Sequence, residues 1–269
     1  MLLSTLLPLM VASLSGELKA SEMPSASKSN DTEDFERGRP LWQAPEGGEP
    51  AWKGALSLGA TFVEGNTGEL SLAFIFDIKR RTEIDRLTFD AYYNYGKASV
   101  GAGPLVETVE NAGAGIKYDY FLDDKTYALA NTSVQMDNPA GVDSRTIVGA
   151  GVGRQVRDDE TFEWGVEGGL SNVTQILDNT PDSSYLGLRL ASNLAYTISE
   201  SASFEQITEY LPNVDDFGEL YLKLDNRLKM SISENWIGMF SWVFEYTDPI
   251  AGDHVDQRLV FTLGWSFGS

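Results

Sequence analysis

The 269-residue chain is long enough for one large all-β domain or two small ones, and its lack of cysteine excludes disulfides, thiolate metal sites and cysteine nucleophiles. The formal net charge of −20 argues against nucleic acid as a partner, because nothing would offset phosphate repulsion. Aromatic residues make up 11% of the chain, and together with 26 glycines they favour an ordered, turn-rich β protein over a disordered acidic one.

The first twenty residues have features of an export signal. Met1–Leu14 contains an apolar run that is too short to cross a bilayer as a helix, and small residues follow it. We expect a signal peptide over residues 1–20, with cleavage after Ser15 or Ala20, although no Lys or Arg precedes the apolar run. A buried helix is the alternative.

Residues 21–51 have the composition of an acidic linker. The segment holds four prolines and little apolar periodicity, so burial cannot offset the entropy lost on ordering. We expect it to be disordered, with Trp42 as the one residue that could dock locally.

From Trp52 onward the sequence alternates between apolar and polar residues with the period of a β-strand. In residues 69–80, the apolar positions fall on one face, and Ile75 is the only large apolar residue on the other. Twelve segments follow this rule: 52–63, 69–80, 85–97, 107–121, 126–136, 144–156, 161–172, 184–198, 202–210, 219–230, 235–247 and 254–267. Short polar turns alternate with longer loops between them, as in outer-membrane barrels.

A soluble β-sandwich also alternates, so three further features decide between the two folds. The polar faces carry charges in mid-strand, which a polar lumen would accept. The segments run about 10–14 residues, which suits a tilted path across a bilayer. Aromatic residues gather near the strand ends, as in an interfacial girdle. We therefore predict an all-β fold: a transmembrane antiparallel up-and-down β-barrel of about 12 strands over residues 52–269, in the outer membrane and in contact with its lipids.

The ordered set of motifs resembles a known family. The motifs are the Gly65-Asn66-Thr67 turn, the Arg80-Arg81 turn, Asp143-Ser144-Arg145 leading into the glycine-rich stretch 149–153, and the final strand from Asp256 to Phe267. Together they resemble the salt-induced outer-membrane protein family, a bacterial group classed as a domain of unknown function. The resemblance covers about 52–269. It implies an outer-membrane barrel linked to salt response, with no established reaction.

The last strand also suggests a partner. Outer-membrane barrels usually end on an aromatic residue that the barrel-assembly machinery reads, and the resemblance places Phe267 in that role. Here Gly268 and Ser269 follow it.

The alternation places charges of both signs on the inward face. The lumen-facing candidates are Asp77, Lys79, Asp90, Glu163, Glu167, Arg189, Asp225, Arg227 and Arg258. Two loops also share the motif Val-Asp-x-Arg at their ends, which gives Asp143 with Arg145 and Asp256 with Arg258. Because residues two apart on a strand share a face, we expect each pair to neutralise itself inside the barrel.

Enzymatic and metal-binding functions have little support. An outer-membrane hydrolase would need a general-base histidine, and the only one is His254, in the last loop. The acidic loops around 137–143 and 248–256 offer oxygen ligands, but their spacing matches no EF-hand-type calcium loop. We expect no enzyme activity, no cofactor and no metal.

Three functions remain open from the sequence. The first is a narrow passive channel for small ions or solutes, or an envelope component, useful under osmotic or salt stress. The second is a non-conducting structural or surface-binding barrel that acts through its acidic loops. The third is a hydrolase centred on His254.

Overall fold

The computed structural model describes residues 50–63, 67–100, 103–159, 161–178, 181–248 and 255–268. The expected signal peptide, the linker up to residue 49 and His254 lie outside the described residues. The strands are β1 (Ala51–Val63), β2 (Thr67–Arg81), β3 (Asp85–Val100), β4 (Val106–Phe121), β5 (Thr126–Asp137), β6 (Val142–Asp158), β7 (Phe162–Leu177), β8 (Ser183–Ser199), β9 (Ala202–Pro212), β10 (Leu220–Ser231), β11 (Trp236–Asp248) and β12 (Val255–Gly268). No helix in these ranges is long and apolar enough to cross a membrane.

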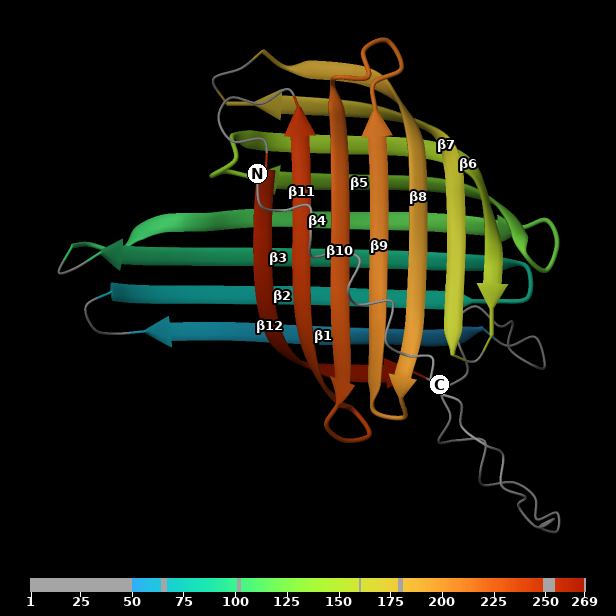
Figure 1. Cartoon of the computed structure of the whole chain (residues 1–269), viewed down its shortest axis with the longest axis horizontal. Helices are drawn as coiled ribbons and strands as arrows, with labels where there is room; N and C mark the ends of the chain where they lie inside the picture. Colours follow the sequence, from blue (N-terminus) through green and yellow to red (C-terminus); the bar gives the residue numbers. More distant parts are fainter. Residues whose placement is uncertain are drawn as a thin grey trace, which may run out of the picture. The chain divides into compact units, whose positions relative to one another are not determined.

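The strands form one closed antiparallel barrel. Each strand pairs with its neighbours in sequence, and β12 pairs with β1 to close the ring. In Figure 1 the strands β8–β11 cross β1–β5 of the opposite wall steeply, and β12 curves round to reach β1. The twelve-strand prediction is therefore confirmed. The largest difference in extent is β7, which continues to Leu177 because Val173, Gln175 and Leu177 keep the inward alternation.

The barrel is apolar outside and polar inside, the reverse of a soluble protein. Outward side chains such as Leu259 and Phe261 are 65% and 69% exposed, whereas inward Glu167 and Arg189 are only 5% and 6% exposed. In water this apolar exterior would be exposed to solvent, so the fold favours an apolar environment around the barrel.

The two ends of the barrel differ. Short turns at 82–84, 122–125, 200–201 and 232–235, together with the short β6–β7 connection, join the strands at one end, here called the turn-side end. Longer connections join most of the strands at the loop-side end. Outward aromatic pairs mark the turn-side end: Trp236 and Trp265 meet edge to face with centroids 5.5 Å apart, and Phe162 lies 6.3 Å from Tyr196. This pattern is typical of an interfacial girdle.

Inward glycines give the lumen its room. A Cβ at Gly113 would lie 2.6 Å from the ring of Tyr92, and one at Gly153 would lie 2.3 Å from the ring of Tyr127. The two rings therefore lie over these glycines of the neighbouring strands, which keeps the rings out of the centre of the barrel.

A small apolar core fills part of the loop-side end. Its members are Ile147, Val173, Tyr185, Leu211 and Tyr221, contributed by β6 to β10. The lumen is therefore a packed interior over part of its cross-section rather than a wide water-filled channel.

Candidate functional site in the barrel lumen

Three cavities follow one another along the lumen, and Tyr92 lines all of them. The central chamber has a volume of about 400 Å³ and reaches Ser203, Ser231 and Ile237 beside the turn-side end. A second cavity of about 50 Å³ lies between β2–β3 and β10–β12. A third, of about 30 Å³, reaches Ala140 in the β5–β6 loop at the loop-side end.

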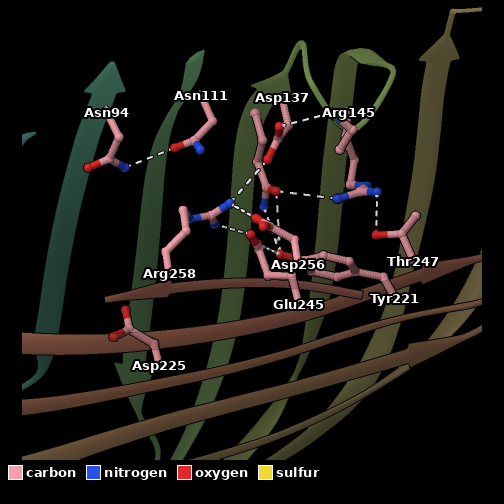
Figure 2. Close-up of polar contacts among 12 residues, drawn as sticks. Asn94, Asn111, Asp137, Arg145, Tyr221, Asp225, Glu245, Thr247, Asp256 and Arg258 are labelled. Carbon is pink, nitrogen blue, oxygen red and sulfur yellow. Dashed lines mark hydrogen bonds and ion pairs between the residues drawn. The ribbon is translucent and has the colours of Figure 1, made fainter. Parts of the chain in front are cut away.

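An ion-pair bridge separates the two small cavities. Arg258 on β12 pairs with Asp256 on its own strand and with Glu245 on β11, and its Nη1 lies 3.1 Å from Oδ2 of Asp137 on β5. The Tyr221 hydroxyl donates a hydrogen bond of 2.6 Å to Glu245. Figure 2 shows these groups converging on one point inside the barrel. One guanidinium therefore holds three carboxylates together across the lumen.

Arg145 forms a second crossing beside this bridge. From β6 it donates hydrogen bonds of 2.8 Å to Gln175 on β7 and to Thr247 on β11, and its guanidinium stacks 4.4 Å from the centroid of the Tyr221 ring. Because β6 and β11 are not neighbours, this bond also ties opposite walls of the barrel together (Figure 2).

A buried charge cluster lies on the β4–β9 side of the chamber. Glu167 on β7 pairs with Lys117 on β4 and, at 2.8 Å, with Arg189 on β8; it also accepts a 2.9 Å hydrogen bond from the Tyr127 hydroxyl. Arg189 in turn reaches Glu209 on β9 at 2.8 Å. The Glu167 side chain is fully buried, and removing it would leave Lys117 with Asp119 and Arg189 with Glu209 as their remaining ion-pair partners.

A third group of charges lies on β9 and β10 and reaches β2 across the lumen. Arg227 pairs with Asp225 at 2.7 Å and with Asp77 across the lumen at 3.5 Å. Lys229 pairs with Glu205 at 2.9 Å.

The structure places the lumen-facing candidates as follows. Asp77, Lys79, Asp90, Arg189, Asp225 and Arg227 line the central chamber, and Arg258 lines the cavity above it. Glu167 lies behind the chamber wall as the partner of Arg189. Glu163, near the start of β7, shares the inward parity of Glu167 and is half-buried.

One of the two expected aspartate–arginine pairs is corrected. Asp256 and Arg258 pair as expected. The register of β6 shifts between Val142 and Ser144, and this bulge turns Val142 inward and leaves Asp143 exposed while Arg145 is buried. The prediction that Asp143 shares the lumen face with Arg145 was wrong because simple parity does not hold across a bulge.

Several lumen residues were missed from the sequence. Glu245 and Tyr221 lie at inward positions of their strands, whereas Trp242 and Leu222 on the same strands point outward. The alternation of the sequence therefore contained enough information to predict both residues. Asp137 could not be found in this way, because the register of β5 also shifts before it.

The same bridge is the place where a cation could be held. Oxygens of Asp137, Glu245 and Asp256 all lie within 4.8 Å of one another. Asp137 and Asp256 come from the two acidic loop regions considered for calcium, but Arg258 already lies among these carboxylates and supplies the positive charge. The arrangement is therefore that of an internal ion-pair bridge.

Comparison with known proteins identifies the family. A family model described as "Protein of unknown function, DUF481" matches residues 56–267. The chain belongs to the DUF481 family. The match runs from β1 to the end of β12, so family membership covers nearly the whole barrel and confirms the resemblance noted from the sequence motifs. No curated protein matches the chain.

Solved structures similar to this DUF481 member are distant. The COG4313 outer membrane channel from Pseudomonas putida F1 shares 12% identity, with a TM-score of 0.45, over 89% of this chain and all of that chain. The NanC porin shares 10% identity, with a TM-score of 0.44, over 82% of this chain and all of that chain. The translocator domain of the autotransporter NalP from Neisseria meningitidis shares 12% identity, with a TM-score of 0.42, over 83% of this chain and 89% of that chain.

Proposed function

We propose that this barrel lies in the outer membrane of a Gram-negative bacterium and acts as a narrow passive channel for small ions and solutes. The observation that carries the proposal is the series of three charge-lined cavities that share Tyr92 and run between the two ends of the barrel. A polar lumen inside an apolar wall is what a channel requires.

The membrane location is supported by the outer surface. Exposed apolar side chains cover the outward faces of the strands, and strands of 11 to 17 residues are long enough to cross a bilayer at a tilt. Localisation is tested by fractionating cells and following the full chain on gels. Recovery in outer-membrane fractions, with faster migration before heating than after it, is expected; a soluble fraction would refute the location.

Passage would be limited at the bridge around Arg258. The cavities on either side of it have volumes of only about 30 and 50 Å³, close to the liquid volume of one or two water molecules. We therefore expect a low conductance and exclusion of sugars, with ions passing when the side chains of the bridge rearrange.

The alternative function is a non-conducting barrel. The cross-lumen contacts of Arg258 and Arg145 favour it, because they tie opposite walls together near the loop-side end. The two functions are separated by liposome swelling with the refolded full chain: swelling in small electrolytes but not in disaccharides supports the channel. No swelling in any solute, from a sample with a folded heat-modifiable band, supports the alternative.

The link to salt stress rests on the family resemblance alone. It predicts that a strain lacking the protein grows more slowly than its parent after a shift to high salt, and that the wild-type gene restores growth. Equal growth of the two strains would remove this part of the proposal. We propose no enzymatic role.

A further inference from the structure

The central chamber is lined by more basic than acidic side chains, although the whole chain carries a net charge of −20. Seven basic and five acidic side chains line the chamber. The basic ones are Lys53, Lys79, Lys117, Arg189, Lys223, Arg227 and Lys229, and the acidic ones are Asp77, Asp90, Glu205, Glu209 and Asp225. Glu167, behind the chamber wall, offsets Lys117 and Arg189, so the excess of positive charge lies among the remaining basic side chains.

The excess is concentrated toward the turn-side end, around Lys79. Lys79 on β2 is directly opposite Lys53 on β1 in the strand register. Like charges directly opposite each other destabilise a sheet. Lys229 and Arg86 also lie near enough to repel Lys79, while Glu205 and Asp77 attract it. The wall therefore brings several cations together around two carboxylates.

The nearby carboxylates are already engaged. Glu205 pairs with Lys229 at 2.9 Å, and Asp77 pairs with Arg227 at 3.5 Å. Within the described ranges Lys79 has no ion pair closer than 4.0 Å, and Lys53 lies directly opposite it in the strand register. A charged amine in a partly dehydrated chamber needs a counter-ion, and a solute anion can supply it.

We propose that Lys53, Lys79 and Lys229 form a binding site for small solutes that carry two or more carboxylate or phosphate groups. Ammonium groups on flexible stems suit such ligands because each can donate to a different oxygen. The chamber has a volume of about 400 Å³, which is large enough for a small polyanion but too small for a coiled polymer chain. This inference deepens the proposed channel function, since it names the class of solute that the channel prefers.

The test uses inorganic tripolyphosphate as the probe. The full chain, refolded in a zwitterionic detergent at low salt, is titrated by calorimetry, and its thermal midpoint is followed with and without probe. The variant Lys79→Gln removes a cation that has no ion pair closer than 4.0 Å, so no carboxylate loses a direct ion-pair contact, and Glu205 loses only a longer-range attraction. The matched control is Lys125→Gln, because Lys125 lies in the β4–β5 turn, away from the chamber.

The two readouts of Lys79→Gln should respond differently. The affinity for tripolyphosphate should fall about tenfold or more while the probe-free thermal midpoint changes little, since the loss of attraction from Glu205 and Asp77 offsets the relief of repulsion from Lys53 and Lys229. Lys125→Gln should change neither by a comparable amount. A merely structural lysine would instead lower the midpoint and leave the affinity unchanged, and that result would overturn the inference.

The inference and the channel function fail in distinguishable ways. Tripolyphosphate binding that depends on Lys79, in a sample that gives no current in bilayers, would keep the site and refute the channel. A conducting protein that binds no tripolyphosphate, or binds it equally well as Lys79→Gln, would keep the channel and refute the site. In a conducting protein, the site further predicts a reversal potential on the anion-selective side in a potassium chloride gradient.

Discussion

Arg258 on β12 and Asp137 on β5 join two walls of the barrel that are not neighbours, with 3.1 Å between Nη1 and Oδ2. The two residues come from the two loop regions that share the Val-Asp-x-Arg motif, 121 positions apart in the chain. The similarity of these loops thus corresponds to a meeting point inside the barrel. The bridge that results lies between the cavities of about 30 and 50 Å³.

Replacing Arg258 should open this constriction. In Arg258→Gln the guanidinium no longer joins Asp137, Glu245 and Asp256, and the three carboxylates repel one another. We expect single-channel conductance to rise about twofold or more, with the reversal potential shifted toward cations. Arg154→Gln is the control, because Arg154 is exposed near the turn-side end. Equal conductance in wild type and Arg258→Gln would show that the bridge does not limit passage.

Removing Glu167 should destabilise the barrel. In Glu167→Leu, Lys117 and Arg189 lose a fully buried partner, and breaking such a group costs about 3 kcal/mol of unfolding free energy. Urea unfolding from lipid vesicles, followed by tryptophan fluorescence, measures the change. Glu107→Gln is the exposed control. A loss in Glu167→Leu no larger than in the control would contradict the role given to the cluster.

Filling the space at Gly113 should narrow the channel. A Cβ there would lie 2.6 Å from the Tyr92 ring, so Gly113→Val should push the ring off the wall and into the cavities that it lines. We expect lower conductance with little change in strand content by circular dichroism. Gly168→Ala is the control, since a Cβ there meets nothing within 4 Å. Unchanged conductance in Gly113→Val would place the path for ions away from Tyr92.

The β6–β7 turn should show a defined pH dependence. Hydrogen bonding from Arg157 and from Thr161 and Phe162 lowers the pKa of Asp159 to about 2. Because this value lies below the ordinary 3.8, the carboxylate stabilises the fold fully above pH 3.8, and the contribution is lost as pH falls toward 2. The difference in thermal midpoint between wild type and Asp159→Asn should therefore shrink over that range. A difference that stays constant from pH 5 to pH 2 would argue against this assignment.

Much of the fold was predictable because a barrel that is apolar outside and polar inside requires a strict alternation of apolar and polar residues along each strand. The parity of residues such as Asp77, Arg189 and Asp225 followed directly from it, and the structure places all three on the chamber. The Asp256–Arg258 pair followed too, because β12 has no register shift between them.

The remaining features depended on information that a single sequence does not contain. The bulge after Val142 turns Asp143 to the outer face, and no feature of the neighbouring residues predicts this bulge. Contacts across the lumen, such as Asp137 with Arg258 or Arg145 with Thr247, depend on which walls face each other in the closed barrel. That relation is fixed by the stagger of the strands, which alternation leaves undetermined.

Single-channel recording of the refolded full chain in a planar bilayer tests the central claim most directly. The account predicts small, discrete current steps in potassium chloride that grow larger when Arg258 is replaced by Gln. A bilayer that stays silent for both wild type and Arg258→Gln, with each sample showing a folded heat-modifiable band, would contradict the channel and favour a non-conducting barrel.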